Sequence, residues 1–349
     1  MQRRTILTSA AFLAAAAAGP LCAAVQESTQ AFSALGSKPT GARLERMQAS
    51  PNFSNGTFHN LTPVIDPIDR ERSSGMLRFL TEDKTGRRPL ERIPSIKTDL
   101  TTLADGQMVW FGHSGFYLKL AGLAIAVDPA LHACFPLGSF FKPFAGADLY
   151  QPRDIPALDL LILTHDHYDH FSPEDAVKVL KDTTVVVAPE SCAANVREKL
   201  GVTTLGMKPG DTAFVGKAVP DGSEDPRICV EAVRAYNVEP ERLGFHPKDN
   251  DWLGYVVTVD GVRYCVSGDT DQNEDNLQVT CDIALIPIGG TYTFDAAQAA
   301  AFVNAIRPQA VVPTHYGTAV GTKDAVDDFI PLVERGVQTI VKMEWPDLG

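Results

Sequence analysis

The chain has 349 residues, of which 44% are hydrophobic and 21% are charged, and its formal net charge is −12. This length and composition suffice for one large globular domain or two smaller ones. The acidic balance argues against a nucleic-acid-binding or anionic-membrane-binding protein, because both of those partners select basic surfaces.

The N-terminus has the pattern of an export signal. Arg3 and Arg4 precede an Ala-rich apolar stretch at 10–18, and small residues follow up to Ala24. This order is typical of a cleaved signal, and the stretch is too short for a stable membrane span. The paired arginines resemble a twin-arginine signal, which exports folded proteins. We therefore expect residues 1–24 to be the export signal of a periplasmic protein, with an uncleaved N-terminal helix as the alternative.

Residues 25–104 show neither strand-like alternation nor a long amphipathic helix, and they contain several prolines. This pattern predicts an N-terminal arm that packs on a domain formed by residues 105–349. The chain also has six scattered cysteines: Cys22, Cys134, Cys192, Cys229, Cys265 and Cys281. Without a C-x-x-C they indicate neither a disulfide framework nor a thiolate zinc site. One disulfide bridge is compatible with them, but the sequence does not show which two would pair.

Three short β-like runs at 108–111, 116–120 and 123–127 predict an antiparallel meander with glycine turns, ending at Asp128. His113 lies in the first turn. A histidine bonded to a backbone carbonyl and a histidine near the site are both compatible with that position. The aromatic-rich stretch at 131–153 would either shape a pocket or pack on its own domain.

The apolar run at 160–163 predicts a strand buried on both faces. It leads directly into His165, His167, Asp169 and His170. These side chains would be costly to bury together without a cation, whereas neutral imidazole and carboxylate are natural ligands of divalent metals. The H-x-H-x-D-H spacing therefore predicts a metal site.

Two more buried strands end in side chains that can bind metal. One ends in Gly268-Asp269-Thr270, and the other ends in His315. The alternation of strand-like and helical stretches between these motifs predicts an α/β fold in which helices cover the sheets.

The three strand-end motifs, in this order, resemble those of the metallo-β-lactamase superfamily. Two turns, one at His113 and the other Gly-Gly-Thr-Tyr at 289–292, resemble those of one branch of this superfamily. That branch contains enzymes like the phospholipase D that acts on N-acyl-phosphatidylethanolamine and enzymes like the ascorbate-phosphate lactonases. The resemblance covers the chain from about residue 105 onward. It implies a four-layer αββα sandwich, preceded here by the extended arm.

The resemblance also implies two divalent cations, zinc first, with manganese or iron as alternatives. His165 and His167 would hold the first cation, and Asp269 would bridge both. The second cation would be held by Asp169, His170 and His315. Asp169 and Asp269 are the expected catalytic residues. Asp128 would orient the ligand loop through hydrogen bonds.

The sequence departs from the family at the third ligand of the first cation, where Asn237 replaces the usual histidine. Either Asn237 is a weak oxygen ligand, or His246 reaches in, or this site is incomplete. His246 and Lys248 are also candidates for binding a phosphate or carboxylate of the substrate. Tyr292 could donate a hydrogen bond to an oxyanion.

The expected activity is hydrolysis of an ester, phosphodiester or lactone by a metal-bound hydroxide, with a small-molecule or lipid-like substrate. No serine lies in a G-x-S-x-G setting, so no serine nucleophile is expected. The alternative is a metal-binding or scaffold protein of the same fold without turnover, which Asn237 keeps open. The oligomeric state does not follow from the sequence.

Overall fold

The computed structural model describes residues 41–49, 53–54, 57–58, 96–131, 146–147, 149–218, 224–317 and 325–341. The predicted export signal, most of the arm and most of the aromatic-rich stretch lie outside these ranges. Within them, no helix has both the length and the apolar character needed to cross a membrane.

The first sheet has the strand order β3-β4-β5-β6-β7-β8. Its strands are β3 (Gln107–Gly112), β4 (Gly115–Leu120), β5 (Leu123–Val127), β6 (Leu160–Ile162), β7 (Val185–Pro189) and β8 (Thr204–Met207). The first three strands form the predicted meander, and the last three continue parallel to β5. The β6 side chains are all 0% exposed, as expected for the centre of a sheet covered on both faces.

The second sheet has the order β15-β14-β13-β12-β11-β10-β9. Its strands are β9 (Thr212–Ala218), β10 (Glu224–Arg234), β11 (Leu253–Val259), β12 (Val262–Val266), β13 (Ile283–Pro287), β14 (Ala310–Thr314) and β15 (Gln338–Thr339). Because β11 runs antiparallel to both β10 and β12, and β12, β13 and β14 are parallel, the carboxyl ends of β10, β12 and β14 lie at one edge.

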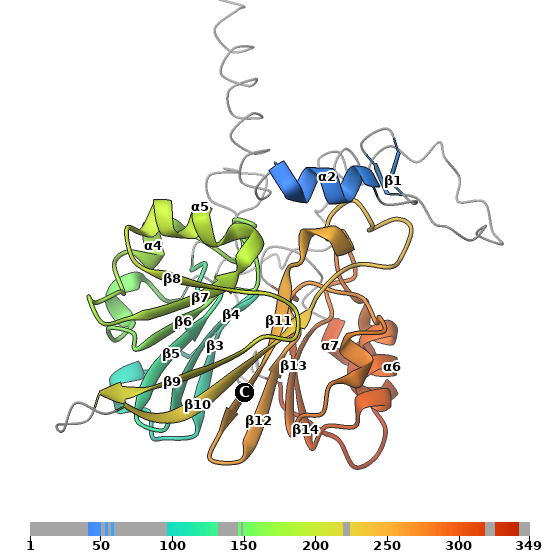
Figure 1. The fold of residues 1–349 in the computed structure, drawn as a ribbon. Coiled ribbons are helices and arrows are strands. Elements are labelled where there is room, and N and C mark those ends of the chain that lie inside the picture. The colour runs from blue at the N-terminus through green and yellow to red at the C-terminus, as the bar shows by residue number, and fades with distance from the viewer. Residues whose placement is uncertain are drawn as a thin grey trace, which may run out of the picture.

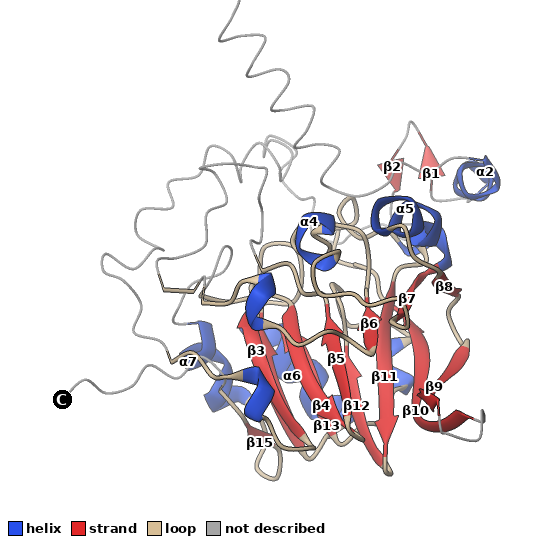
Figure 2. Cartoon of the chain, turned by 90° about the vertical axis from the view of Figure 1, so that its left-hand side faces the viewer, coloured by secondary structure: helices blue, strands red, loops and turns tan. Residues whose placement is uncertain are grey.

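Helices cover the outer faces of both sheets, which confirms the four-layer αββα sandwich (Figures 1 and 2). On the first sheet these are α4 (Pro173–Ala176) and α5 (Glu190–Leu200), and on the second α6 (Ala296–Ile306) and α7 (Ala325–Phe329). Helix α4 is a single turn that begins at Pro173, directly after its N-cap Ser172. One core joins the inner faces of the sheets through side chains such as Phe116 and Tyr255, and a second packs α5 against the first sheet.

Two glycines let backbone segments approach closely beside the strand ends. A Cβ on Gly254 of β11 would lie 2.5 Å from the Ser267 carbonyl oxygen, and one on Gly289 would collide with the His315 carbonyl. Only glycine fits such approaches without a shift of backbone. The two glycines therefore help to set the positions of the loops that carry Asp269 and His315.

The described part of the arm contains α2 (Gly41–Ala49) and a hairpin of β1 (Phe53–Ser54) with β2 (Thr57–Phe58). Helix α2 lies against the short 3₁₀ segment η5 (Lys248–Asn250), two residues beyond His246. Figure 1 shows α2 across the upper end of the molecule. The extent of the arm stays a prediction. The remaining 3₁₀ segments are η2 (Leu100–Thr102), η4 (Pro152–Asp154), η6 (Asn276–Gln278) and η7 (Ile330–Leu332).

Candidate metal centre

Histidine and aspartate side chains from both sheets converge at the strand ends. Three overlapping groups have ligand atoms within 4.8 Å of one another. They are His165, His167 and His246; His113, Asp169, His170 and His315; and His165, His170 and Asp269. The strand-end motifs, separated widely in sequence, therefore meet at one place.

The first group consists of three buried histidines. His167 Nδ1 lies 2.9 Å from His165 Nε2 and 3.2 Å from His246 Nε2. The indole ring of Trp252 packs against all three rings, with centroid separations of 4.8, 4.6 and 5.6 Å to His165, His167 and His246. Trp252 therefore forms an apolar wall that shields this group from water.

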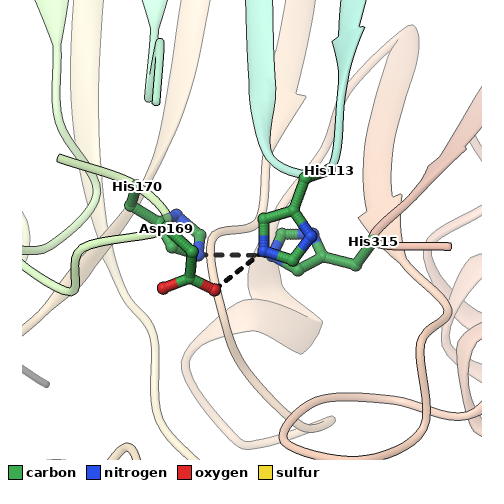
Figure 3. A group of neighbouring side chains, drawn as sticks. All are labelled: His113, Asp169, His170 and His315. Carbon is green, nitrogen blue, oxygen red and sulfur yellow. Dashed lines mark hydrogen bonds and ion pairs between the residues drawn. The ribbon is translucent and has the colours of Figure 1, made fainter. Parts of the chain in front are cut away.

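The second group is assembled from three separate segments (Figure 3). Asp169 and His170 come from the loop after β6, His315 from the end of β14, and His113 from the turn between β3 and β4. His315 Nε2 lies 3.2 Å from His170 Nε2. His113 Nε2 lies 2.7 Å from Asp169 Oδ2, so His113 holds this carboxylate in place.

Asp269 lies between the two groups. Its Oδ1 is 2.9 Å from His315 Nε2 and 3.3 Å from His170 Nε2. Its Oδ2 is 3.3 Å from His246 Nε2. One carboxylate oxygen thus faces each group, an arrangement that imidazole cannot provide for two cations at once.

Asp128, 1% exposed, lies behind the second group. Its carboxylate accepts hydrogen bonds from Thr164 N at 2.8 Å and from Thr164 Oγ1 at 2.6 Å. It also lies 2.8 Å from His170 Nδ1. When His170 Nδ1–H donates to Asp128, Nε2 is left as the acceptor that faces His315 and Asp269. This is the orienting role expected of Asp128.

The local electrostatics favour the ligand forms of several of these side chains. Burial, followed by the neighbouring His246, lowers the pKa of His167 to about 4. Burial also lowers the pKa of His165 well below its usual value. Burial raises the pKa of Asp269, but His315 and His170 outweigh it and keep that pKa well below normal. Near neutral pH, His165 and His167 are therefore neutral and Asp269 is ionised.

These side chains fit divalent cations. Imidazole nitrogens face one another at 2.9–3.2 Å, where two lone pairs would repel unless a cation or a proton lay between them. Two nitrogens on a tetrahedral zinc ion lie roughly 3.4 Å apart, given Zn–N bonds of about 2.0–2.1 Å. Asp269 Oδ1 is buried and accepts no hydrogen bond from the described residues. The donor set and its spacing suit metal binding. Burial lowers the pKa of His170, but the carboxylates of Asp269, Asp128 and Asp169 outweigh burial and raise this pKa, so a cation bound there would replace a proton.

His246 lies in the first metal-capable group, as in one of the three alternatives that the sequence left open for the third ligand. The Nδ2 atom of Asn237 donates to the carbonyl oxygens of Arg242 and Tyr292, at 3.0 and 2.8 Å, and lies 3.0 Å from His246 Nδ1. Asn237 therefore supports the loop that brings His246 in.

The two remaining sequence candidates lie beside this loop. Tyr292 packs its ring edge-on against Phe245, with centroids 4.6 Å apart, and its carbonyl holds Asn237. Lys248 pairs with Glu274 at 2.6 Å and lies over the Tyr236 ring. In this arrangement Lys248 is engaged with the second sheet's loops rather than with the metal-capable groups.

A buried ion pair that the sequence did not reveal stabilises the loop that carries His246. Arg242 Nη2 lies 2.7 Å from Asp271 Oδ1, with side chains 8% and 3% exposed. Asp271 Oδ2 accepts hydrogen bonds from the backbone N–H groups of Val238 and Glu239, both at 3.0 Å. Arg242 also donates to Gln298 and to the Thr293 carbonyl. The pair thus links the His246 loop to the segment that carries Asp269.

Replacing this pair should weaken metal binding at the first group. The double variant Arg242→Met, Asp271→Asn removes both charges, so that neither is left buried without its partner. We expect its affinity for metal at the first group to fall by about 10–100-fold, as is typical when a residue that orients a metal ligand is lost. Calorimetric metal titration measures the effect, and excess metal should restore metal-dependent activity. Arg307→Met, at an exposed arginine, is the control. An unchanged metal affinity in the double variant would exclude this role.

The fold and the two clusters define a metal-dependent hydrolase of the metallo-β-lactamase fold, and comparison with known proteins supports this. A model of the β-lactamase superfamily domain matches residues 107–315. A metal-dependent hydrolase of Pyrococcus furiosus is 29% identical over 242 residues, covering 67% of this chain and 95% of the relative. One from Thermococcus onnurineus is 30% identical over 239 residues, covering 66% and 94%.

Solved structures agree. A protein of Parabacteroides distasonis named as a metal-dependent hydrolase is 27% identical, with a TM-score of 0.52 over 67% of this chain and 91% of that one. An isothiocyanate hydrolase from Delia radicum gut bacteria has a TM-score of 0.53 at 17% identity, covering 68% and 97%, and shows the fold alone. The chain belongs to the metallo-β-lactamase superfamily, and its relatives are metal-dependent hydrolases.

Proposed function

We propose that the protein is a binuclear hydrolase, with zinc as the first candidate metal, that cleaves a phosphodiester in preference to a carboxylic ester or lactone. The observation that carries the proposal is the position of Asp269, whose two oxygens face the two groups of histidines separately. In this assignment His165, His167 and His246 hold the first cation, and Asp269 bridges to the second. The second is held by Asp169, His170 and His315.

Two bound cations would polarise the scissile group and bring the pKa of water toward neutrality. The chain's own residues prepare the site for this chemistry. Asp128 fixes the His170 ring through Nδ1, and His113 holds one oxygen of Asp169. Trp252 excludes water behind the first group. Asp169 retains a second oxygen that is suited to orienting the attacking water.

A phosphodiester fits this arrangement best among the three ester classes. Paired cations about 3.5–4 Å apart stabilise both the attacking and leaving oxygens of an in-line displacement at phosphorus. The substrate is a small molecule or the polar end of a lipid. The place of His246 beside His165 and His167 supports an enzyme over the alternative of a scaffold without turnover, which rested on Asn237 in place of a histidine.

A substrate panel tests the preference. We expect zinc- or manganese-loaded protein to cleave bis(p-nitrophenyl) phosphate with at least about tenfold higher kcat/KM than p-nitrophenyl acetate, a γ-lactone or a chromogenic β-lactam, because of the charge stabilisation above. A His165→Ala variant measures background hydrolysis. A lactone or β-lactam as the fastest substrate would contradict the preference while leaving the metal centre itself in place.

We also propose that the protein is exported to the periplasm by the twin-arginine route. Arg3 and Arg4 before the apolar stretch support this, and a folded metalloprotein could load its cations before export. Cell fractionation should find a periplasmic form that begins near Val25. Replacing both arginines by lysine should retain the protein in the cytoplasm at full length. A periplasmic form that still begins at Met1 would contradict the cleavage.

A further inference from the structure

Two cysteines lie at the ends of the segment that carries Asp269. Cys265 is on β12, four residues before Asp269, and Cys281 lies two residues before β13. Cys265 is 4% exposed and forms a small apolar cluster with Val256 and Val279, and Cys281 packs against the same cluster. The two thiol groups are hydrogen-bonded to each other.

We propose that Cys265 and Cys281 form a disulfide cross-link that closes the segment 266–280. This segment contains both Asp269 and Asp271. Thus the bond would tie together the two ends of the loop that supplies the bridging carboxylate and half of the buried ion pair. The proposal depends on the contact between the thiols and not on the substrate of the hydrolase.

The surroundings of the two thiols determine which thiol reacts first with an oxidant. The hydrogen bond from Cys265 lowers the pKa of the more exposed Cys281, whereas that bond and burial raise the pKa of Cys265. The thiolate is the nucleophile in thiol–disulfide exchange. Cys281 is therefore the thiol that meets an external oxidant, and Cys265 is the thiol that resolves the intermediate.

The oxidant is a disulfide, of a small thiol such as glutathione or of a protein oxidant. Cys281 thiolate attacks one sulfur of that disulfide and expels the other as a thiolate, leaving a mixed disulfide. Cys265 then loses its proton and attacks the Cys281 sulfur, and the second thiolate of the oxidant leaves. The two cysteines lose two electrons and two protons in total, and the oxidant is reduced to two thiols.

The other described cysteines provide internal controls. Cys192 lies on α5, where its Sγ contacts the Pro189 carbonyl oxygen at 3.5 Å. Cys229 is on β10, where its Cα is paired with Thr258 of β11 and with Phe214 of β9. Neither lies in the cluster around Cys265. Among the four cysteines that the structure describes, oxidation of the native protein should therefore be selective for Cys265 and Cys281.

Thiol trapping with peptide mapping tests the proposal. The metal-loaded full chain is equilibrated with oxidised glutathione, quenched in acid, unfolded and treated with maleimide. We expect a cross-linked peptide joining Cys265 to Cys281, two protected thiols and a thermal midpoint raised by several degrees. Cys281→Ala should lose all three, and Cys229→Ala should keep them. Alkylation of both thiols, a glutathione adduct that stops at Cys281, or a different pairing would overturn the proposal.

Discussion

Replacement of Asp269 by alanine is expected to abolish hydrolysis, by at least about 10³-fold in kcat, while the fold is retained. Asp269 directs one oxygen at each group of histidines, at 2.9 Å from His315 and 3.3 Å from His246. Without the shared carboxylate, two cations about 3.5–4 Å apart would repel each other with less negative charge between them. Bound metal should fall from two ions to one or fewer.

The measurement combines kcat, metal analysis and circular dichroism of the purified variant. Asp269→Asn, which keeps the shape but removes the charge, should lose nearly as much activity. Asp182→Ala removes a carboxylate from an exposed turn and should behave as the parent protein. Turnover in Asp269→Ala at the parental rate, with the fold intact, would remove Asp269 from the mechanism.

The second large effect is expected at His246. His246→Ala should weaken binding of the first cation by about 10²-fold or more and reduce hydrolysis accordingly, because a ligand itself is lost. Asn237→Ala should have the smaller effect of about 10–100-fold, because Asn237 acts through the loop that holds His246. Calorimetric titration with zinc, together with metal analysis after dialysis, measures both variants.

The ranking of these two variants is the informative result. If Asn237 supplied an oxygen ligand in place of histidine, Asn237→Ala would lose the first cation and His246→Ala would lose little. An equal and small effect in both variants would mean that the first cation is held by His165 and His167 without a third protein nitrogen. The predicted order, in which His246→Ala weakens binding of the first cation more than Asn237→Ala does, would identify His246 as the ligand.

The parts of the site that the sequence could predict are those encoded in short contiguous strings. His165, His167, Asp169 and His170 follow one buried strand directly, and each of Asp269 and His315 ends another. Since such strands run parallel within their sheets, their ends lie at one edge and the motifs can be expected to meet there. The three β-like runs with glycine turns predicted the meander, whereas the αββα layering was implied by the resemblance to the metallo-β-lactamase superfamily.

The rest depends on contacts between residues that no local pattern connects. His246 lies in a loop beyond β10 rather than at a strand end, so its approach to His167 follows from how that loop folds. The loop is held by the Arg242–Asp271 pair, whose members are charged residues in unremarkable surroundings in the sequence. The contact between Cys265 and Cys281 likewise arises only when the chain returns to β12 after the Asp269 loop.

Helix α2 shows a different limit of sequence-based prediction. It has only nine residues, begins at a glycine and lies in a proline-containing arm, so its helical pattern is short. Its place against η5 gives it a partner that the sequence did not suggest. The helix lies next to the segment that follows His246, which connects the arm to the loop of the first group.

The location of bound metal tests the central claim most directly. Crystals of the metal-loaded protein should give two anomalous-scattering peaks at the absorption edge of the metal. We predict one peak among His165, His167 and His246 and one among Asp169, His170 and His315, with Asp269 between them. A single peak elsewhere, or no peak at this edge of the sheets in protein that hydrolyses its substrate, would contradict the account.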